Sequence, residues 1–300
     1  SVIRDFLNPD FTLVGEIDDR AGRHLEECYS QIMPNKPPCQ RMSLENAELT
    51  KIAVNTYVTT KITFANMLAD LCERIPGGDV DVVSNALGMD ARIGRKYLTG
   101  AIGYGGPCFP RDNVALGFIA RAIGSRAELA ETTDTSNRAL AEKITLRLRP
   151  LIKEGSTVAV LGLSYKPFSH IVEESQGVYL AKALSRAGAR VVGYDPLANE
   201  MARMELHGQT VIMDSMAECL AQADVVVITT PDPAFKDLTP ADLGADTKSV
   251  TVVDFWRILR GKMEDQKNVT YIPIGQSVED DVNSARLREL WGGPVALPAA

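Results

Sequence analysis

The chain has 300 residues, of which 32 are Lys or Arg and 39 are Asp or Glu, so its formal net charge is −7. This length favours two domains, and 45% hydrophobic with 24% charged residues is ordinary for a soluble globular protein with a buried core. The negative charge argues against nucleic acid or an anionic membrane surface as a partner, although local basic groups or backbone amides can still bind a small anion.

Cysteine and histidine show no pattern that indicates a metal site or a disulfide framework. The five cysteines are dispersed and form no CxxC pair: Cys28, Cys39, Cys72, Cys108 and Cys219. The three histidines are isolated: His24, His170 and His207. We therefore expect no metal and reduced thiols in a cytoplasmic protein. A signal-peptide pattern and an apolar run of about 18 residues are both missing from the sequence, so secretion and membrane spanning are not expected.

The first region, residues 1–35, contains one strand-like run at 11–15 and one helix-like stretch at 19–32. One strand and one helix cannot bury a core of their own, so this region is predicted to be the end of a larger unit. The Pro-rich segment 34–38 then predicts a break and a linker.

The second region, residues 43–145, is predicted to be almost entirely helical. Neither Gly nor Pro interrupts 45–73, and apolar residues fall on more than one face there, which predicts a helix buried over most of its circumference. A shorter helix at 80–87, a Gly-rich stretch at 94–112 and a helix at about 135–151 are expected to follow.

The third region, residues 155–300, alternates β-branched runs with helical patterns. The predicted strands are 157–161, 190–194, 225–229, 250–254 and 270–274, and the clearest helical patterns are 178–187 and 215–222. Such alternation predicts β-α-β units and a doubly wound parallel sheet of the α/β class.

Cys108 lies in the most informative segment, residues 103–112, where three glycines and two prolines surround one cysteine. Glycines allow a backbone to approach a ligand closely, and a cysteine on such a turn beside Arg111 can serve as a nucleophile. The alternative is a free cysteine buried as a small apolar side chain. Flanking Gly and Pro favour the loop.

Glu48, Lys51 and Asn55 are spaced by three and four residues, so they share one face of the long predicted helix. In a water-poor cleft, such a lysine can stabilise developing charge or transfer a proton. The alternative is an exposed polar stripe on an amphipathic helix.

The segment 158–166 reads as a strand that ends in Gly162 and runs towards a helix, which is typical of the phosphate-facing edge of a doubly wound sheet. The dinucleotide fingerprint needs three glycines and an acidic residue about 20 residues later. Here only Gly162 is present, and Asp195 comes 33 residues after it. We therefore predict a nucleotide-binding sheet that does not take NAD in the usual manner. Lys166 is either a phosphate or sugar ligand or a solvated loop residue, and Arg92 is either a ligand or part of a surface ion pair.

These segments resemble the UDP-glucose/GDP-mannose dehydrogenase family. The matching segments occur in the family's order and with its approximate spacing: 46–55, 90–94, 103–112, 162–166 and 193–196. The resemblance implies a remnant of an N-terminal NAD-binding domain at 1–35, a helical central and dimerisation domain at 36–150, and a Rossmann-like UDP-sugar-binding domain at 151–300. The family's GxGxxG turn and upstream glutamate are not found in these 300 residues.

The resemblance also implies a reaction, the NAD-dependent oxidation of UDP-glucose to UDP-glucuronate in two steps. Cys108 would form a thiohemiacetal and then a thioester, Lys51 and Asn55 would stabilise the oxyanion, and Asp112 would position or activate water. Substrate contacts are implied for Arg92 (across the dimer interface), Tyr97, Tyr104, Gly105, Lys166 and Arg257. Contacts to NAD are implied for Gly106 and Cys108.

Some positions depart from the family pattern. Ile171 and Glu173 stand where many members have Asp and Arg, Arg257 stands alone where some members have paired arginines, and Pro107 often is Ser. Two alternatives stay open: a nucleotide-sugar-binding dimer fragment without turnover, and a dehydrogenase of another nucleotide sugar such as a UDP-N-acetylhexosamine or GDP-mannose. We expect little NADH formation by this chain alone, because the pyrophosphate lacks a Gly-rich helix N-terminus.

Overall fold

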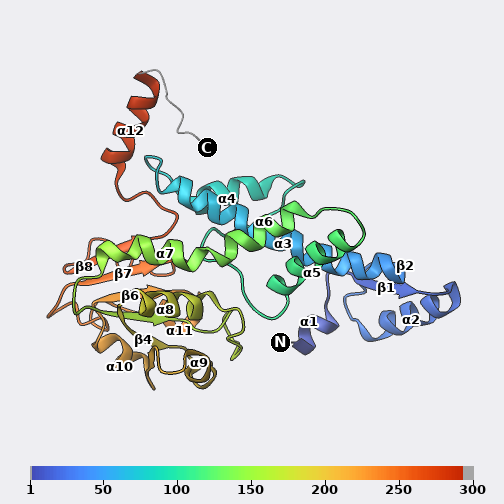
Figure 1. Ribbon diagram of the computed structural model, residues 1–300. Helices are drawn as coiled ribbons and strands as arrows, with labels where there is room; N and C mark the ends of the chain where they lie inside the picture. The colour runs from blue at the N-terminus through green and yellow to red at the C-terminus, as the bar shows by residue number, and fades with distance from the viewer. Residues whose placement is uncertain (1, 293–300) are drawn as a thin grey trace.

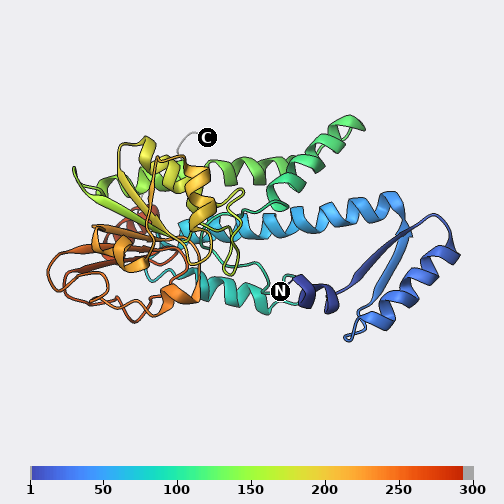
Figure 2. The ribbon, with the colours of Figure 1, turned by 90° about the horizontal axis from the view of Figure 1, so that it is seen from below.

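The computed structural model describes residues 2–292 and shows an elongated molecule with three parts (Figure 1). After the short helix α1 (Val2–Leu7), a small two-stranded unit lies at one end, helices α3 to α7 form the centre, and a six-stranded sheet lies at the other end. The long helix α3 (Leu44–Cys72) runs from the small unit to the large sheet, as Figure 2 shows from below.

The small unit is one β-α-β element. Strand β1 (Thr12–Glu16), helix α2 (Asp19–Ile32) and strand β2 (Cys39–Ser43) follow one another, and the two strands pair in parallel. The first strand and the helix agree with the predicted positions, but β2 was not predicted, because its strand character comes from pairing with β1. This pairing extends the unit across the boundary expected at residue 35.

Helix α3 is as long as predicted, but the prediction that it is buried over most of its circumference is wrong. Its buried residues form a narrow set: Thr56, Thr59, Ala65, Ala69 and Cys72. Large apolar residues on its other faces are exposed: Leu49, Val54, Tyr57, Phe64, Met67 and Leu71. The reason is that α3 meets β1, β2, α4, α5 and α6 over only part of its surface, so these apolar side chains are left uncovered within the described residues.

Four more helices complete the centre: α4 (Val80–Met89), α5 (Phe109–Ala122), α6 (Glu128–Arg138) and α7 (Leu140–Leu148). The single helix expected at about 135–151 is in fact the end of α6, the whole of α7 and a short 3₁₀ turn at Arg149–Leu151. The break falls at Ala139, which is both the C-cap residue of α6 and the N-cap residue of α7.

The large sheet confirms the predicted α/β class. Six parallel strands run in the order β5-β4-β3-β6-β7-β8. This is a doubly wound order, in which successive strands are added first on one side of β3 and then, from β6 on, on its other side. The strands are β3 (Thr157–Leu161), β4 (Arg190–Tyr194), β5 (Val211–Ile212), β6 (Val225–Ile228), β7 (Val250–Asp254) and β8 (Val269–Pro273). The helices between them are α8 (Gln176–Arg186), α9 (Asn199–Leu206), α10 (Met216–Ala221) and α11 (Pro233–Lys236), and α12 (Asp280–Gly292) follows β8.

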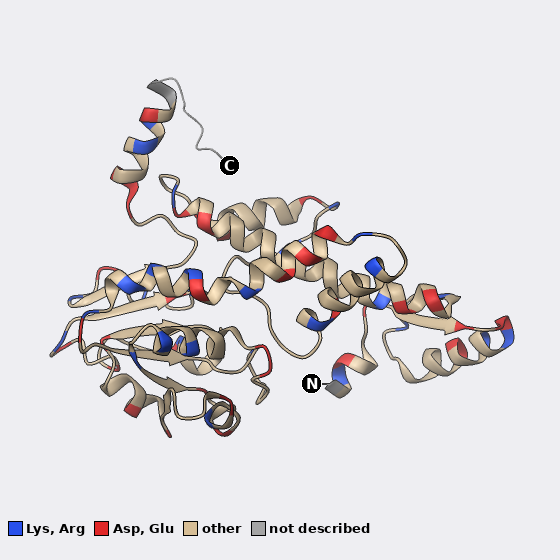
Figure 3. Ribbon diagram, in the orientation of Figure 1, with Lys and Arg blue, Asp and Glu red and all other residues tan. Residues whose placement is uncertain are grey.

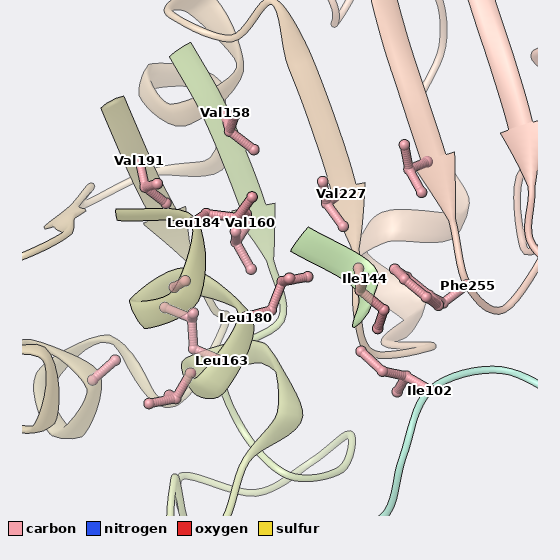
Figure 4. Packing of buried hydrophobic residues seen from close by; sticks show 14 of the residues in the cluster. Ile102, Ile144, Val158, Val160, Leu163, Leu180, Leu184, Val191, Val227 and Phe255 are labelled. Carbon is pink, nitrogen blue, oxygen red and sulfur yellow. The ribbon is translucent and has the colours of Figure 1, made fainter. Parts of the chain in front are cut away.

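The core of the sheet continues into the helical centre. On one face, Val158, Val160 and Val227 of the strands pack with residues of α8, and Ile102 and Ile144 of the centre join the same cluster (Figure 4). Burial of so many apolar side chains at one junction is the main stabilising term here, at about 25 cal/mol per Å² of apolar surface removed from water. The centre and the sheet are therefore packed as one body.

Two surface properties bear on partners. Basic and acidic residues occur in all three parts of the molecule (Figure 3). Among the described residues, no helix is both long enough and apolar enough to cross a membrane.

Candidate active site

Cys108 lies immediately before helix α5, as its N-cap residue, and its side chain is exposed. Pro110 sits in the first turn of this helix, where a missing amide proton costs no intrahelical hydrogen bond. The amide of Asp112 donates to the Cys108 carbonyl at 2.9 Å, which closes the first turn. The thiol is thus held at the positive end of a helix dipole, where negative charge is stabilised.

Asp112 joins the helical centre to the cysteine. Its carboxylate oxygen Oδ2 accepts hydrogen bonds from Lys51 Nζ and from Asn55 Nδ2, each at 2.6 Å. The carboxylate is buried, with only 6% of the residue exposed, whereas 55% of the Lys51 side chain is exposed. The polar face predicted for α3 therefore meets the first turn of α5, although Glu48 points to solvent. This arrangement places two hydrogen-bond donors on a carboxylate that lies one helical turn after Cys108.

Three aromatic rings line the approach to this loop. The Phe109 ring lies edge to face with Tyr97 at 6.4 Å and with Tyr104 at 6.2 Å between centroids. Tyr97 is half-exposed and has a positive φ of 66°, whereas Tyr104 is buried. Burial raises the pKa of the Tyr104 hydroxyl, and the nearby Asp134 carboxylate acts in the same direction. Tyr104 therefore stays neutral in any physiological range.

Asn113 fixes the aromatic group from behind. Its fully buried amide Nδ2 donates to Thr59 Oγ1 at 3.0 Å, to the Tyr104 hydroxyl at 3.2 Å and to the Phe109 carbonyl at 3.0 Å. Because buried polar groups must find partners, this residue orients α5 on α3.

Tyr104 is also held by its backbone. Its amide donates to Asn137 Oδ1 at 3.0 Å, and its carbonyl accepts from Asn137 Nδ2 at 2.9 Å and from Gln176 Nε2 at 3.0 Å. A Cβ at Gly103 would lie 2.2 Å from Asn137 Oδ1, so only glycine permits this approach.

The glycine loop meets the sheet domain at its next residues. The amide of Gly106 donates to the Glu173 carbonyl at 3.0 Å, and a Cβ at Gly106 would lie 2.6 Å from the Tyr165 ring. Gly106 also has a φ of 84°, which favours glycine. Gly105 approaches the carbonyl of the residue after Glu173 in the same way. The ammonium of Lys166 lies 5.3 Å from the centroid of the Tyr165 ring, within the range of a cation–π contact. Lys166 and the cysteine loop are therefore neighbours through Tyr165.

The turn after β3 does not present a free phosphate site. Asp195 Oδ2 accepts the amides of Leu163 at 2.8 Å and Ser164 at 2.9 Å, together with the Ser164 hydroxyl. These are amides of the kind that bind a pyrophosphate in a dinucleotide fold. Because a buried carboxylate already accepts them, the turn does not fit the NAD pyrophosphate. The β1–α2 turn is closed similarly by Asp18, which caps α2.

The structure does not bring Arg92 or Arg257 to the cysteine within this chain. The guanidinium of Arg92 pairs with Asp90 at 2.6 Å, and 88% of its side chain is exposed. Arg257 is 1% exposed at its side chain and donates to both carboxylate oxygens of Asp81, at 2.8 and 2.9 Å. It also donates to the carbonyls of Gly100, Phe255 and Ile274. Arg257 therefore links the end of β7 to α4. Its buried, fully bonded guanidinium does not fit the expected contact with substrate.

Sequence reasoning missed Asn113, Asn137 and Gln176. Each is a carboxamide on a predicted or actual helix, and from sequence such residues look like part of a solvated face. Asn137 follows Thr133 by four residues, a spacing that places both on one side of a helix. In the structure both are buried on the same side of α6, so this spacing was the available signal. Among residues 2–292, no group of three or more His, Cys, Asp or Glu side chains is arranged to hold a metal ion.

An exposed thiol at a helix N-terminus, a lysine–carboxylate–amide group one turn further along and an adjoining doubly wound sheet are the features expected of an α/β protein of the nucleotide-sugar dehydrogenase class. Residues 45–139 match the central domain of the UDP-glucose/GDP-mannose dehydrogenase family, and residues 159–261 match the family's UDP-binding domain. The chain belongs to this family of oxidoreductases.

Sequence and structure comparisons with individual proteins support membership of this family. The chain is 36% identical over 282 residues to a UDP-glucose 6-dehydrogenase from Rhizobium meliloti, covering 92% of this chain and 64% of that protein. It is also 36% identical over 233 residues to a UDP-glucose 6-dehydrogenase from Haloferax volcanii, covering 77% and 54%. A UDP-glucose dehydrogenase structure from Pyrobaculum islandicum matches with a TM-score of 0.79 at 31% identity, covering 92% of this chain and 61% of that one. The chain thus spans less than two thirds of the length of these relatives.

Proposed function

We propose that this chain carries the covalent-catalysis and nucleotide-sugar-binding parts of an NAD-dependent UDP-glucose 6-dehydrogenase. The observation that carries the proposal is the Asp112 group, in which Lys51 and Asn55 donate to one carboxylate oxygen of a residue one helical turn after Cys108. Relatives named UDP-glucose 6-dehydrogenase support the choice of sugar nucleotide.

The two oxidations need a hydride acceptor, for which the family implies NAD. The turns after β1 and β3 do not fit its pyrophosphate, because Asp18 and Asp195 already accept their amides. Gly106 and Cys108 are our proposal for the contacts to the hydride acceptor.

Cys108 attacks the aldehyde carbon at C6 of the sugar as a thiolate. The sulfur–carbon bond forms, the carbonyl π electrons move to oxygen, and Lys51 and Asn55 stabilise the resulting oxyanion as hydrogen-bond donors, an effect of about 3–4 kcal/mol per donor. Once oxidised, the adduct is a thioester. Asp112 positions a water for attack on the thioester carbon, the sulfur–carbon bond breaks, and the uronate leaves while the thiol is regenerated.

The nucleotide sugar binds between the glycine loop and the sheet domain. Lys166, Tyr97 and Gly105 lie around this junction and supply a cation, an aromatic face and close backbone approach, whereas the buried Tyr104 ring supports Phe109. Arg257 is not part of this set, because its guanidinium is committed to Asp81 and three carbonyls.

The proposal includes a homodimer formed through the central helices. Two of the exposed apolar side chains of α3, Phe64 and Met67, line a groove of about 1060 Å³ that is also lined by α6, α7 and β8. The exposed Arg92 then reaches the partner's site rather than its own.

Calorimetric titration of the purified chain with UDP-glucose, compared with GDP-mannose and without NAD, tests the proposal. Selective heat from UDP-glucose supports it, and binding of GDP-mannose alone would assign another sugar nucleotide. The other candidate function, a nucleotide-sugar-binding dimer without turnover, is favoured by the closed Asp195 turn. NADH formation with UDP-glucose separates the two, and strong NADH production by the 300-residue chain would refute the binding-only candidate.

A further inference from the structure

Three carboxamides surround Tyr104, and one of them comes from another part of the molecule. Asn113 and Asn137 belong to the helical centre, as Tyr104 does, whereas Gln176 is the first residue of α8 in the sheet domain. Gln176 lies 72 residues from Tyr104 in the chain, and its Nε2 donates to the Tyr104 carbonyl at 3.0 Å. This bond therefore joins two parts that are distant in sequence.

The orientation of these amides follows from their partners. The Tyr104 carbonyl only accepts, so both groups that face it must be NH₂ groups. The Tyr104 amide only donates, so Asn137 faces it with Oδ1. Asn137 holds Tyr104 within the helical centre, but its hydrogen bonds do not connect Tyr104 to the sheet domain.

Gln176 is buried, with 5% of the residue exposed, and its Oε1 is buried without a hydrogen-bond partner among the described residues. Its carboxamide thus makes one hydrogen bond, the one to Tyr104. Three residues earlier in the chain, the Glu173 carbonyl accepts the Gly106 amide at 3.0 Å. The short segment 173–176 therefore makes hydrogen bonds to the glycine loop at Tyr104 and at Gly106, four and two residues before Cys108.

The same segment is continuous with the nucleotide-binding side of the sheet. The loop that leaves β3 carries Tyr165 and Lys166 and then returns to Gln176 at the start of α8. The Tyr165 amide donates to the Ile171 carbonyl at 3.0 Å, which closes this loop on itself. Lys166, Glu173 and Gln176 therefore belong to one loop, and this loop contacts the cysteine loop.

From these contacts we propose that Gln176 is a positioning residue through which the nucleotide-binding sheet sets the orientation of the Cys108 thiol. This inference rests on the proposed function in one respect, that Cys108 is the reacting group. It assigns to Gln176 no contact with substrate.

The test is the rate at which iodoacetamide alkylates Cys108 in the full 300-residue chain, followed by mass spectrometry of the tryptic peptide that contains it. Cys28, exposed on α2, serves as the internal reference. Gln176→Leu removes the donor and keeps a similar side-chain volume. We expect it to change the Cys108 rate relative to Cys28 by about two- to tenfold, the range of one neutral hydrogen bond.

Two further variants separate positioning from general loss of packing. Gln222→Leu removes a carboxamide at the end of α10 that does not approach the cysteine loop, and it should leave the Cys108 rate unchanged. Gln176→Glu keeps the shape of the side chain, but its carboxyl group donates a hydrogen bond only when protonated. The ratio of its Cys108 alkylation rate to the wild-type rate at the same pH should therefore approach one as the pH falls to about 5. Gln176→Glu also serves if Gln176→Leu does not fold.

An unchanged Cys108 rate in Gln176→Leu would overturn the inference, as would a Gln176→Glu rate that ignores pH or an equal effect of Gln222→Leu. Calorimetry with UDP on the same proteins keeps the two proposals apart. If the wild-type chain does not bind UDP but the Cys108 rates are as expected, only the nucleotide-sugar function is refuted. UDP binding with an unchanged Cys108 rate in Gln176→Leu would refute the positioning role alone.

Discussion

The carboxylate of Asp112 lies 2.6 Å from the ammonium of Lys51, although 61 residues separate them in the chain. Asp112 is one turn after Cys108 on α5, and Lys51 projects from α3. The ion pair therefore aligns two helices and, with them, the thiol and its neighbouring donors. The exposure of Lys51 leaves its ammonium open to a ligand, whereas the carboxylate is enclosed.

Removing Asp112 should cost more stability than removing Lys51. Asp112→Ala leaves the partly buried Asn55 amide without its acceptor and is expected to lower the free energy of unfolding by about 1–3 kcal/mol. Lys51→Met removes a half-exposed, solvent-screened partner and should cost less than about 1 kcal/mol. Urea unfolding measures both, with the exposed Glu48→Ala as the control on the same helix. Equal losses for the two variants would contradict this account of the pair.

Arg257 should behave as a structural residue. Arg257→Ala leaves Asp81 and three buried carbonyls without their donor, which should destabilise the chain by about 3–5 kcal/mol. The affinity of the folded protein for UDP-glucose should be unchanged in calorimetry below the unfolding temperature. Arg260→Ala, which removes the more exposed pair with Asp79, is the matched control and should cost about 1 kcal/mol or less. A loss of affinity with stability retained would return Arg257 to the substrate site.

Asp79 should make stability sensitive to acid. Burial opposes its ionisation, but hydrogen bonds from Arg260 and from amides in the first turn of α4 outweigh burial and hold its pKa below the ordinary value near 3.8. Stability from a depressed carboxyl pKa is fully present above that ordinary value and is lost as pH falls through the lowered pKa. Asp79→Asn keeps a good N-cap, so it should be less stable than wild type at pH 7, with the difference shrinking between about pH 4 and pH 2.

Denaturant titrations at a series of pH values measure this effect. Asp246→Asn makes the same charge change at an exposed position and should run parallel to wild type. A constant difference between Asp79→Asn and wild type down to pH 2 would rule out this contribution.

The exposed apolar face of α3 should mediate self-association. Phe64→Glu combined with Met67→Glu puts two charges on that face beside the groove, and burying them in an interface would be costly. Sedimentation velocity is expected to show a dimer for wild type and a monomer for the double variant. The control, Leu197→Glu, alters an exposed apolar residue of the sheet domain and should leave the dimer intact. A dimer that survives the double variant would place the interface elsewhere.

Much of the fold was predictable because local patterns and burial agree. The buried runs of β3, β6 and β7 are mostly β-branched and apolar, and helical patterns occur among them, so both their positions and the parallel sheet followed from periodicity. Strand β2 has no such pattern, because its extended backbone depends on pairing with β1. The two-residue strand β5 is defined in the same way, by pairing with β4.

The sequence by itself determined the chemistry of the candidate site: a cysteine among glycines, a Lys51–Asn55 helix face and a strand that ends in one glycine. Those signals depend on residue type and on spacing along one element, which the chain alone contains. Only the tertiary structure decided that Asp112 receives both donors, that Gln176 reaches Tyr104 and that Arg257 is buried against Asp81. Each of these contacts joins residues 57 to 176 positions apart, and their formation depends on how the helices and the sheet pack, which local periodicity does not encode.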